Sequence, residues 1–263
     1  MKFSLITVTM GNRQKELMRL KSSLAAQTYR DFEHIVIDHR EHPELLGSLS
    51  RARNLGLSMA SGDVVAFPDD DIWYGPDTLE KAVVILADPD VDGISFRVVD
   101  EKGTLSAGWM SSCDFKIAAK NIWHSAVSCS VFLKRRALGD VRFDETLGLG
   151  SGTRFGSGEE TDLLLTLIER GARLYYYGSN SVFHSSFRKR HTIGRAWLYG
   201  NGCGLVLRRH GYGVIRLLWM VFSQCGRAAQ SILMLRPHKA LFSLTMAAGR
   251  IAGYLFCQFK VRP

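Results

Sequence analysis

The sequence of 263 residues is long enough to bury a sizeable core, and its 46% hydrophobic and 22% charged residues are ordinary for a folded globular protein. These values exclude a peptide-sized scaffold and a wholly disordered chain. The net charge of +9 is unevenly distributed: of the 34 lysines and arginines, 15 lie in residues 170–263 without any acid, while the other 19 share residues 1–169 with all 25 acidic residues. We interpret this asymmetry as adaptation to an anionic partner, phospholipid or nucleic acid.

The five cysteines are widely scattered and include no CxxC pair. An odd number of isolated cysteines is typical of reduced core thiols and not of a disulfide framework or a zinc site. The apolar run at the N-terminus is interrupted at once by Gly11 and Asn12, so it is too short for a signal peptide. We therefore expect the catalytic part of the chain to lie in the cytoplasm.

The first part of the chain alternates apolar runs with helical patterns. Leu17, Leu20 and Leu24, at spacings of three and four, indicate a helix between two strands. Strands that alternate with helices predict an α/β fold with a parallel sheet, whose ligands bind at the carboxyl ends of the strands. The elements expected here are a strand at 4–8, a strand at 32–37 that closes on Asp38, a helix at 52–59, and a strand at 64–67 that is followed by Pro68 and the run Asp69, Asp70, Asp71.

The next part predicts strands at 93–99 and 127–133, a glycine-rich loop at 148–158 and a helix at 160–170. After Ser185 the composition becomes basic and apolar. We place a domain boundary there, within about ten residues, because boundaries are the least certain feature of a sequence. The expected organisation is a catalytic domain at 1–185 and a helical C-terminal region at 186–263.

Three consecutive carboxylates, Asp69 to Asp71, follow a buried strand. Like charges a few ångströms apart raise each other's pKa, and a bound cation removes this conflict. Oxygen ligands without cysteine favour Mg²⁺ or Mn²⁺, whose coordination shell substrate phosphates often complete. The run therefore predicts a metal site that binds a diphosphate. The alternative is that these acids favour the start of the helical pattern at 79–86 through the helix dipole.

At this point the chain resembles family 2 glycosyltransferases with the GT-A fold. The matching stretches are SLITVTMGNRQKELMRLKSSLAAQTYRDFEHIVID, ARNLGLSMASGDVVAFPDDDIWYGPDTLE and GSGEETDLLLTLIERGARLYYYGSNSVFH, which span nearly all of residues 1–184. Their order and spacing are specific, although no single motif is decisive. The resemblance implies a Rossmann-like, mostly parallel central sheet flanked by helices, a nucleotide-sugar donor and a Mn²⁺ or Mg²⁺ cofactor.

The resemblance also implies which residues hold the donor. The first strand and its loop, here near Thr7, and the acid after the second strand, here Asp38, hold the nucleotide. A second acid often follows in the family, and His39 stands at that position, so the base that is recognised stays open. Arg53 resembles a position that contacts the nucleotide, and an exposed helix residue is the alternative reading.

The resemblance extends to the metal. Asp69 and Asp71 match the DxD metal motif of the family, and Asp70 corresponds to the acid nearest the sugar and ribose. His184, at the end of a strand-like run, matches a histidine that reaches the metal or the diphosphate. A structural hydrogen-bonding role is the alternative for this histidine, with Arg188, Lys189 and Arg190 neutralising the diphosphate instead.

The acids that begin the helix at 160–170 are candidates for the general base. The family usually has Glu-Asp here and assigns catalysis to the second acid, which corresponds to Glu160. Glu159 and Asp162 are interpreted as helix-start and orienting residues. Glu160 would take the proton of the acceptor hydroxyl while the acceptor oxygen attacks the anomeric carbon, so a single displacement inverts this centre. The acceptor expected is a glycan or a lipid-linked molecule of cell-surface polysaccharide or glycolipid synthesis.

The C-terminal region predicts two amphipathic helices. In the first, over 214–235, polar residues fall on one stripe, and the second repeats the arrangement around Lys239, Ser243 and Arg250. Neither segment is a clean transmembrane helix. With the acid-free charge balance, we expect both to lie on an anionic membrane at its cytoplasmic face. Packing of the apolar faces on the catalytic domain or on a second subunit of a homodimer is the alternative. The members of the first polar stripe are Arg216, Ser223, Arg227 and Gln230.

Two other function classes fit parts of this pattern. A nucleotidyltransferase acting on sugar phosphates would also use acids on a metal, but the segment TMGNRQKE is a poor phosphate loop. A nucleic-acid-binding module would use the basic tail, but that tail contains no recognised RNA or DNA motif and its apolar stripes fit lipid better. We therefore expect no nucleic-acid partner.

Overall fold

The computed structural model describes residues 1–106, 110–185 and 192–256. The chain forms two compact units. The first contains Met1–Gly47, Arg51–Phe143 and Leu163–Arg188, and the second contains Ser48–Ser50, Asp144–Asp162 and Lys189–Pro263. The second unit thus includes the glycine-rich loop as well as the C-terminal region. The expected diphosphate-neutralising residues Arg188, Lys189 and Arg190 lie outside the described residues.

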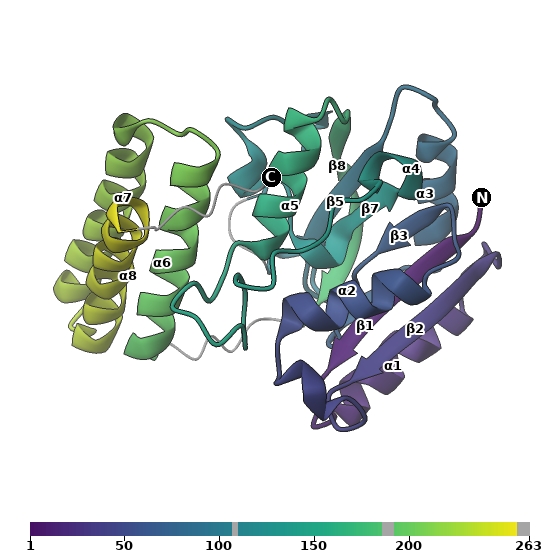
Figure 1. Cartoon of the computed structure of the whole chain (residues 1–263), viewed down its shortest axis with the longest axis horizontal. Helices are drawn as coiled ribbons and strands as arrows, with labels where there is room; N and C mark the ends of the chain where they lie inside the picture. The colour runs from purple at the N-terminus through teal and green to yellow at the C-terminus, as the bar shows by residue number, and fades with distance from the viewer. Residues whose placement is uncertain (107–109, 186–191, 257–263) are drawn as a thin grey trace. The chain divides into compact units, whose positions relative to one another are not determined.

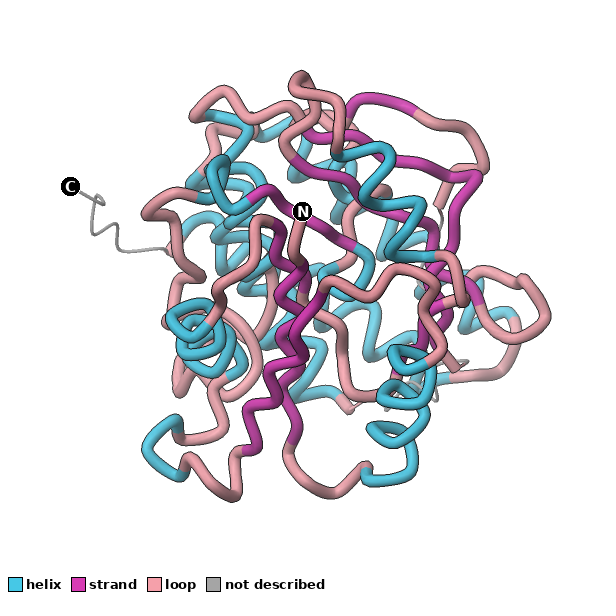
Figure 2. Tube along the Cα trace, turned by 90° about the vertical axis from the view of Figure 1, so that its right-hand side faces the viewer, coloured by secondary structure: helices cyan, strands magenta, loops and turns pink. Residues whose placement is uncertain are grey.

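The first unit is built on one sheet, seen as the arrows in Figure 1 and the magenta segments in Figure 2. Its strands follow the order β2, β1, β3, β7, β5, β8, β4, with β6 paired to β8. Their bounds are β1 Phe3–Thr9, β2 Phe32–Asp38, β3 Val64–Ala66, β4 Ile72–Tyr74, β5 Gly93–Val99, β6 Phe115–Lys116, β7 Val131–Lys134 and β8 Leu174–His184.

The longest strand pairings are parallel. Strand β1 pairs in parallel with β2 and with β3, and β5 pairs in parallel with β8. The shorter partners β7, β4 and β6 run antiparallel to their neighbours. The α/β class and the mostly parallel sheet are therefore confirmed. Because β1 lies between β2 and β3, the carboxyl ends of these three strands meet at one edge, with Thr9 directly opposite Asp38.

Helices accompany the sheet (Figure 1). Helix α1 buries Leu17, Leu20 and Leu24, the residues whose spacing predicts it. Helix α3 begins at Thr78, and β4 separates it from the three aspartates, so these acids do not cap a helix. The helices assigned wholly or partly to the first unit are α1 Gln14–Ala25, α2 Leu49–Met59, α3 Thr78–Leu86, α4 Arg135–Leu138 and α5 Glu159–Glu169, with short 3-10 turns at Pro43–Leu45, Ile122–His124 and Ser128–Ser130.

One predicted strand is shorter than expected. In place of a strand over 127–133, the chain makes a 3-10 turn at Ser128–Ser130 and only then enters β7. The Ser130 hydroxyl donates to the Val127 carbonyl at 2.9 Å and so stabilises the turn. The turn places Ser128 beside the buried Arg53, which becomes important at the site.

The second unit contains the C-terminal helices α6 Ile193–Arg209, α7 Val214–Leu233 and α8 Pro237–Leu255. Helices α6 and α8 touch through glycines: a Cβ atom on Gly204 would lie 2.2 Å from the Arg250 carbonyl oxygen, and one on Gly253 would lie 2.1 Å from that of Asn201. Any side chain there would push the backbones apart. The expected C-terminal helical appendage is thus confirmed. Within the described ranges, no helix is long and apolar enough to cross a membrane.

Candidate functional site

The carboxyl ends of β1 and β3 bring Thr9 and the three aspartates together in the first unit. The Thr9 hydroxyl donates to Asp70 Oδ2 at 2.8 Å, and the Gly11 amide donates to the same hydroxyl at 3.1 Å. Asp70 is buried, and burial raises its pKa although Thr9 and Arg13 act in the opposite direction. The loop after β1 therefore approaches the acids directly.

Arg13 partly neutralises this acidic run. Its Nη1 atom lies 3.1 Å from Asp70 Oδ1 and 2.6 Å from Asp71 Oδ2. The guanidinium is half exposed, so it can leave the carboxylates without unfolding its surroundings. Arg13 thus occupies acceptor positions that a metal ion or another cation would otherwise use.

His184 joins the acids from the end of β8. Strand β4 pairs Ile72 with His184, and this register places His184 Nε2 3.1 Å from Asp71 Oδ1. Burial lowers the pKa of His184, but the hydrogen bond and charge of Asp71 outweigh it and raise the pKa above its ordinary value. Burial likewise favours a neutral Asp71, yet His184 and Arg13 hold the pKa of Asp71 below its usual range.

Arg53 is held inside the first unit. It is only 2% exposed, and its Nη2 atom lies 3.3 Å from Asp69 Oδ1 and 3.1 Å from the Ser128 hydroxyl. Its guanidinium also faces the Phe143 ring, 5.3 Å from the centroid. The alternative reading of Arg53 as an exposed helix residue is wrong, because the residue is buried against the first aspartate of the run.

Asp38 ends β2 and is bound by a neighbouring arginine. Arg40 Nε lies 3.1 Å from each carboxylate oxygen, and Nη2 lies 2.5 Å from Oδ2. These hydrogen bonds lower the pKa of Asp38. Thr7, in contrast, lies inside the sheet, fully buried, with its hydroxyl 3.0 Å from His34 Nε2. The hydroxyl at the edge where Asp38 lies is that of Thr9, because side chains of the last strand residue reach the loop region.

The donor set suits a hard or borderline divalent cation. Asp71, directly before β4, offers carboxylate oxygen, and His184, at the end of the adjacent β8, offers imidazole nitrogen, and both groups can bind Mn²⁺. His184 Nδ1 faces the Ser185 carbonyl, and this contact orients the ring so that Nε2 points toward Asp71. Across the described ranges, no three His, Cys, Asp or Glu side chains are grouped as a complete metal site. Phosphate oxygens would therefore have to supply further ligands.

The second unit contains the acids at the start of α5. Glu159 is 7% exposed and lies against the glycine-rich loop, where a Cβ atom on Gly148 would approach its carboxyl group at 3.0 Å. Asp162 is 1% exposed. Glu160 is partly exposed. Of these three acids, Glu160 is thus the one that an external hydroxyl can reach.

Asp162 takes part in a buried charge network of the second unit. Arg209 Nη1 lies 2.8 Å from Asp162 Oδ1 and 2.8 Å from Asp144 Oδ2, while His210 Nε2 lies 3.0 Å from Asp162 Oδ1. The network ties the first turn of α5 to the end of α6. Tyr199, also on α6, has a pKa raised first by burial, and the charges of Glu159 and Glu160 act in the same direction. Tyr199 therefore lies near the acid pair.

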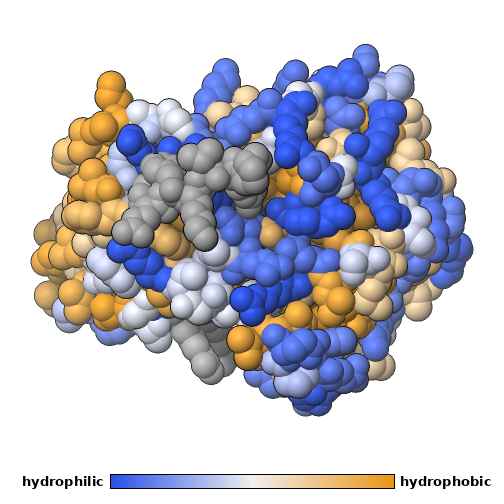
Figure 3. All heavy atoms as spheres, viewed as in Figure 1, coloured by the Kyte–Doolittle hydropathy of each residue, from blue (hydrophilic) through white to orange (hydrophobic). Residues whose placement is uncertain are grey.

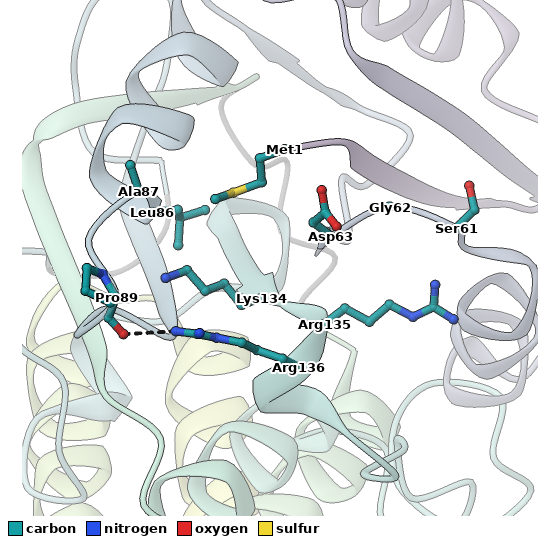
Figure 4. A pocket seen from close by; sticks show the side chains of 10 residues that line it. All are labelled: Met1, Ser61, Gly62, Asp63, Leu86, Ala87, Pro89, Lys134, Arg135 and Arg136. Atoms are coloured by element: carbon teal, nitrogen blue, oxygen red, sulfur yellow. Dashed lines mark hydrogen bonds between the residues drawn. The ribbon is translucent and has the colours of Figure 1, made fainter.

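A surface depression of the first unit lies away from these residues (Figure 4). It is lined by Met1, which precedes β1, and by Asp63, which precedes β3, so it lies at the amino ends of the strands. Two of the cations that line it donate to backbone carbonyls: Arg136 to that of Pro89 at 2.9 Å and Lys134 to that of Asp88 at 2.7 Å. Because ligands of such sheets bind at the carboxyl ends of the strands, we interpret this depression as a feature of the fold and not as a binding site.

Residues 39–138 match the protein-family model described as Glycosyl transferase family 2. This part of the chain is a family 2 glycosyltransferase domain. A curated relative, the pre-mycofactocin glycosyltransferase of Mycobacterium tuberculosis, is 32% identical over 189 residues, which cover 67% of this chain and 38% of the relative. The chain therefore spans well under half the length of this relative.

Solved structures of low sequence identity support the same fold. S. aureus TarS 1-349 has a TM-score of 0.60 at 15% identity, covering 96% of this chain and 91% of that one. The mannosyltransferase PcManGT from Pyrobaculum calidifontis, solved with GDP-Man and Mn²⁺, has a TM-score of 0.62 at 16% identity, covering 97% of this chain and 87% of that one. TarS 1-349 has also been solved with UDP-GlcNAc. The GT-A fold of this family 2 chain is thereby confirmed.

The sequence pointed to Asp38, Arg53, Asp69, Asp71 and His184, and the structure shows specific contacts at each. It also reveals three residues that sequence reasoning missed: Thr9, Arg13 and Arg40. Thr9 is the last residue of β1, and Arg13 lies in the loop that follows this strand. Their position at the carboxyl end of a strand was the feature of the sequence that could have identified them. No feature of the sequence indicated Arg40, because its side chain contacts Asp38 only when it folds back onto that residue, two positions earlier.

Proposed function

We propose that the protein is an inverting, metal-dependent glycosyltransferase that moves a sugar from a nucleoside diphosphate sugar to a hydroxyl of a glycan or lipid-linked acceptor. The observation that carries this proposal is the approach of Asp71 Oδ1 and His184 Nε2 to 3.1 Å beside Asp69 and Asp70, in a family 2 domain. Cell-surface polysaccharide or glycolipid synthesis is the process that this chemistry serves.

The donor side of the reaction belongs to the first unit. Asp38 and Thr9 hold the nucleotide, so Thr9 replaces Thr7 as the contributing threonine of β1. Asp71 and His184 would hold Mn²⁺ or Mg²⁺, with Asp69 positioned by the buried Arg53. The ion, when bound, supplies positive charge to the departing diphosphate. Asp70, which accepts a hydrogen bond from Thr9, would contact the ribose and sugar.

The acceptor side relies on Glu160. Its carboxylate takes the proton of the acceptor hydroxyl as the acceptor oxygen forms a bond with the anomeric carbon. The bond from that carbon to the diphosphate oxygen breaks at the same time, and the nucleoside diphosphate leaves. The Asp162, Arg209 and His210 contacts keep the first turn of α5 in place. A single displacement inverts the anomeric centre.

We place the enzyme at the cytoplasmic face of an anionic membrane. Support comes from the segment after Glu169, in which every charged side chain is basic. Each lysine or arginine near an anionic surface contributes on the order of 1 kcal/mol of attraction, which decays within a Debye length. A lipid-linked acceptor would be presented at the same surface.

A panel of UDP-sugars and GDP-sugars, each incubated with the full chain and Mn²⁺, tests the proposed activity by release of the nucleoside diphosphate. We expect release from at least one donor, and chelation with EDTA should abolish it. Release of pyrophosphate from a nucleoside triphosphate and a sugar phosphate would instead identify a nucleotidyltransferase. Failure of every donor in the presence of acceptor extracts would count against the proposal.

Arg13→Ala should increase the affinity of the free protein for Mn²⁺ by several-fold. The substitution frees the carboxylate oxygens of Asp70 and Asp71 that Arg13 now contacts, and a half-exposed ion pair contributes about 1 kcal/mol or less. Calorimetric titration with Mn²⁺ measures the change. Lys15→Ala, which removes an exposed cation from the first turn of α1, a helix that begins directly after Arg13, is the matched control. Equal Mn²⁺ affinity in all three proteins would show that Arg13 does not compete with the metal.

A further inference from the structure

The outer side of α7 is apolar and faces solvent. Ile215 is 85% exposed, Trp219 69% and Phe222 67%, and their spacing places them on one side of the helix together with Leu218. The side continues to Leu233 at the end of α7, which is 84% exposed, and to Leu235 in the turn before α8, which is 89% exposed. Figure 3 shows orange, apolar residues gathered over the part of the second unit that α7 and α8 form. We call these six residues the insertion face.

The inner side of the same helices combines small and polar residues with a few larger apolar ones. Helix α7 buries Leu217, Val221, Gln224 and Ala228, and α8 buries Ala240, Ser243, Ala247, Gly249, Gly253 and Tyr254. The Gln224 amide lies 3.0 Å from Arg227 Nη1 and 3.2 Å from Arg250 Nη2, so its oxygen accepts from both when turned toward them. A helix surrounded by water normally buries its large apolar residues. In α7 the largest apolar residues, Trp219 and Phe222, are instead exposed, so the helix has a second apolar side that no residue of the described chain covers.

The turn between the two helices has a second unusual feature. Leu235 adopts a φ of 54°, the left-handed region that is unfavourable for a residue with a branched side chain. Its side chain projects into solvent, where it gains nothing from burial in the protein. Arg236 and Lys239 follow immediately and are exposed. The turn thus presents apolar side chains next to cations, as a segment at a lipid headgroup boundary does.

The charges around the insertion face favour a lipid bilayer, and not a second copy of the chain, as the partner that covers this face. Arg216 and Arg227 lie on the polar stripe that borders the insertion face. Residues 170–263 contain no acid, so two insertion faces packed on each other would bring arginines together without an opposite charge. An anionic leaflet supplies that charge. A helix with one apolar side and one polar side that contains arginines suits a position in the plane of the lipid–water interface.

We propose that the insertion face, Ile215, Leu218, Trp219, Phe222, Leu233 and Leu235, is buried in the interfacial region of an anionic lipid leaflet. The inference rests on the proposed location of the enzyme at such a membrane and adds the residues that enter it. Electrostatic attraction alone would leave these side chains in water and would be lost in high salt. Insertion buries them, so salt should release the protein only partly.

The double variant Trp219→Ser/Phe222→Ser tests the proposal by flotation of the full chain with phosphatidylglycerol-containing vesicles. We expect its partition coefficient to fall at least about tenfold, because two aromatic side chains no longer enter lipid. Val84→Ser/Met18→Ser removes exposed apolar residues of the first unit and should bind as the wild type does. Vesicles of phosphatidylcholine alone should bind the wild type weakly.

Brominated lipids give an independent measurement. Trp219→Phe should retain vesicle binding but lose most of the quenching of tryptophan fluorescence that brominated acyl chains cause in the wild type. Equal flotation of the double variant and the wild type, or unchanged quenching in Trp219→Phe, would overturn insertion. So would a wild type that ignores vesicles but forms dimers which the double variant does not form.

Donor hydrolysis without vesicles separates this inference from the proposed chemistry. Wild type and double variant should release nucleoside diphosphate at equal rates, because Trp219 and Phe222 lie outside the proposed donor and base residues. Absence of release from both, together with normal vesicle insertion, would count against glycosyl transfer and leave the insertion face established.

Discussion

Asp71→Ala should weaken binding of the nucleotide sugar in Mn²⁺ by at least about a hundredfold while leaving the fold intact. The substitution removes the carboxylate that lies against His184 and Arg13, and with it the charge that would hold the cation against the diphosphate. The fold should tolerate the change because Asp71 sits beside the buried Asp70, so removing one negative charge also relieves repulsion.

Isothermal calorimetry with the donor found active in the panel measures this effect, and circular dichroism monitors the fold. Asp77→Ala is the matched control: it removes a carboxylate six residues farther on, whose partner is Lys81 at the surface. A surface pair at this helical spacing contributes only about 0.3–0.5 kcal/mol. Unchanged donor affinity in Asp71→Ala, measured in Mn²⁺, would remove Asp71 from the metal site.

Glu160→Gln should preserve donor binding and lower the turnover number by at least about a hundredfold. The amide keeps the size and polarity of the side chain but cannot accept the proton of the acceptor hydroxyl. Because Glu160 is partly exposed at the start of α5, the change should leave packing undisturbed. The loss should therefore appear in kcat with acceptor present, while the affinity for donor stays the same.

Neighbouring acids supply the comparisons for Glu160. Glu169→Gln, at the exposed end of the same helix, should leave turnover unchanged. Asp162→Asn should mainly lower thermal stability, since it removes the buried partner of Arg209 and His210. Turnover of Glu160→Gln within a few-fold of the wild type would locate the base at another residue, and Glu159 would be the next to test.

Local patterns in the sequence were sufficient for several features. The spacing of Leu17, Leu20 and Leu24 predicts α1, and acids placed after apolar runs predict the ligand edge of the sheet, because both depend on residues close together in the chain. No local pattern in the sequence predicts the antiparallel pairing of β7 with β3 or the 3-10 turn that shortens β7. Both depend on contacts between segments more than sixty residues apart in the chain: β7 pairs with β3, and Ser128 of the turn contacts Arg53.

The sequence by itself determined the α/β class, the family resemblance, the candidate acids and the absence of acids after Glu169. Only the tertiary structure decided which side chains are accessible: Glu159 is buried and Glu160 is not, and Arg53 lies inside against Asp69. It likewise decided that the large apolar residues of α7 face outward. Hydrophobic periodicity shows that a helix has distinct sides, but which side is covered depends on the helices that pack against it, and these glycine-mediated contacts form only in the folded chain.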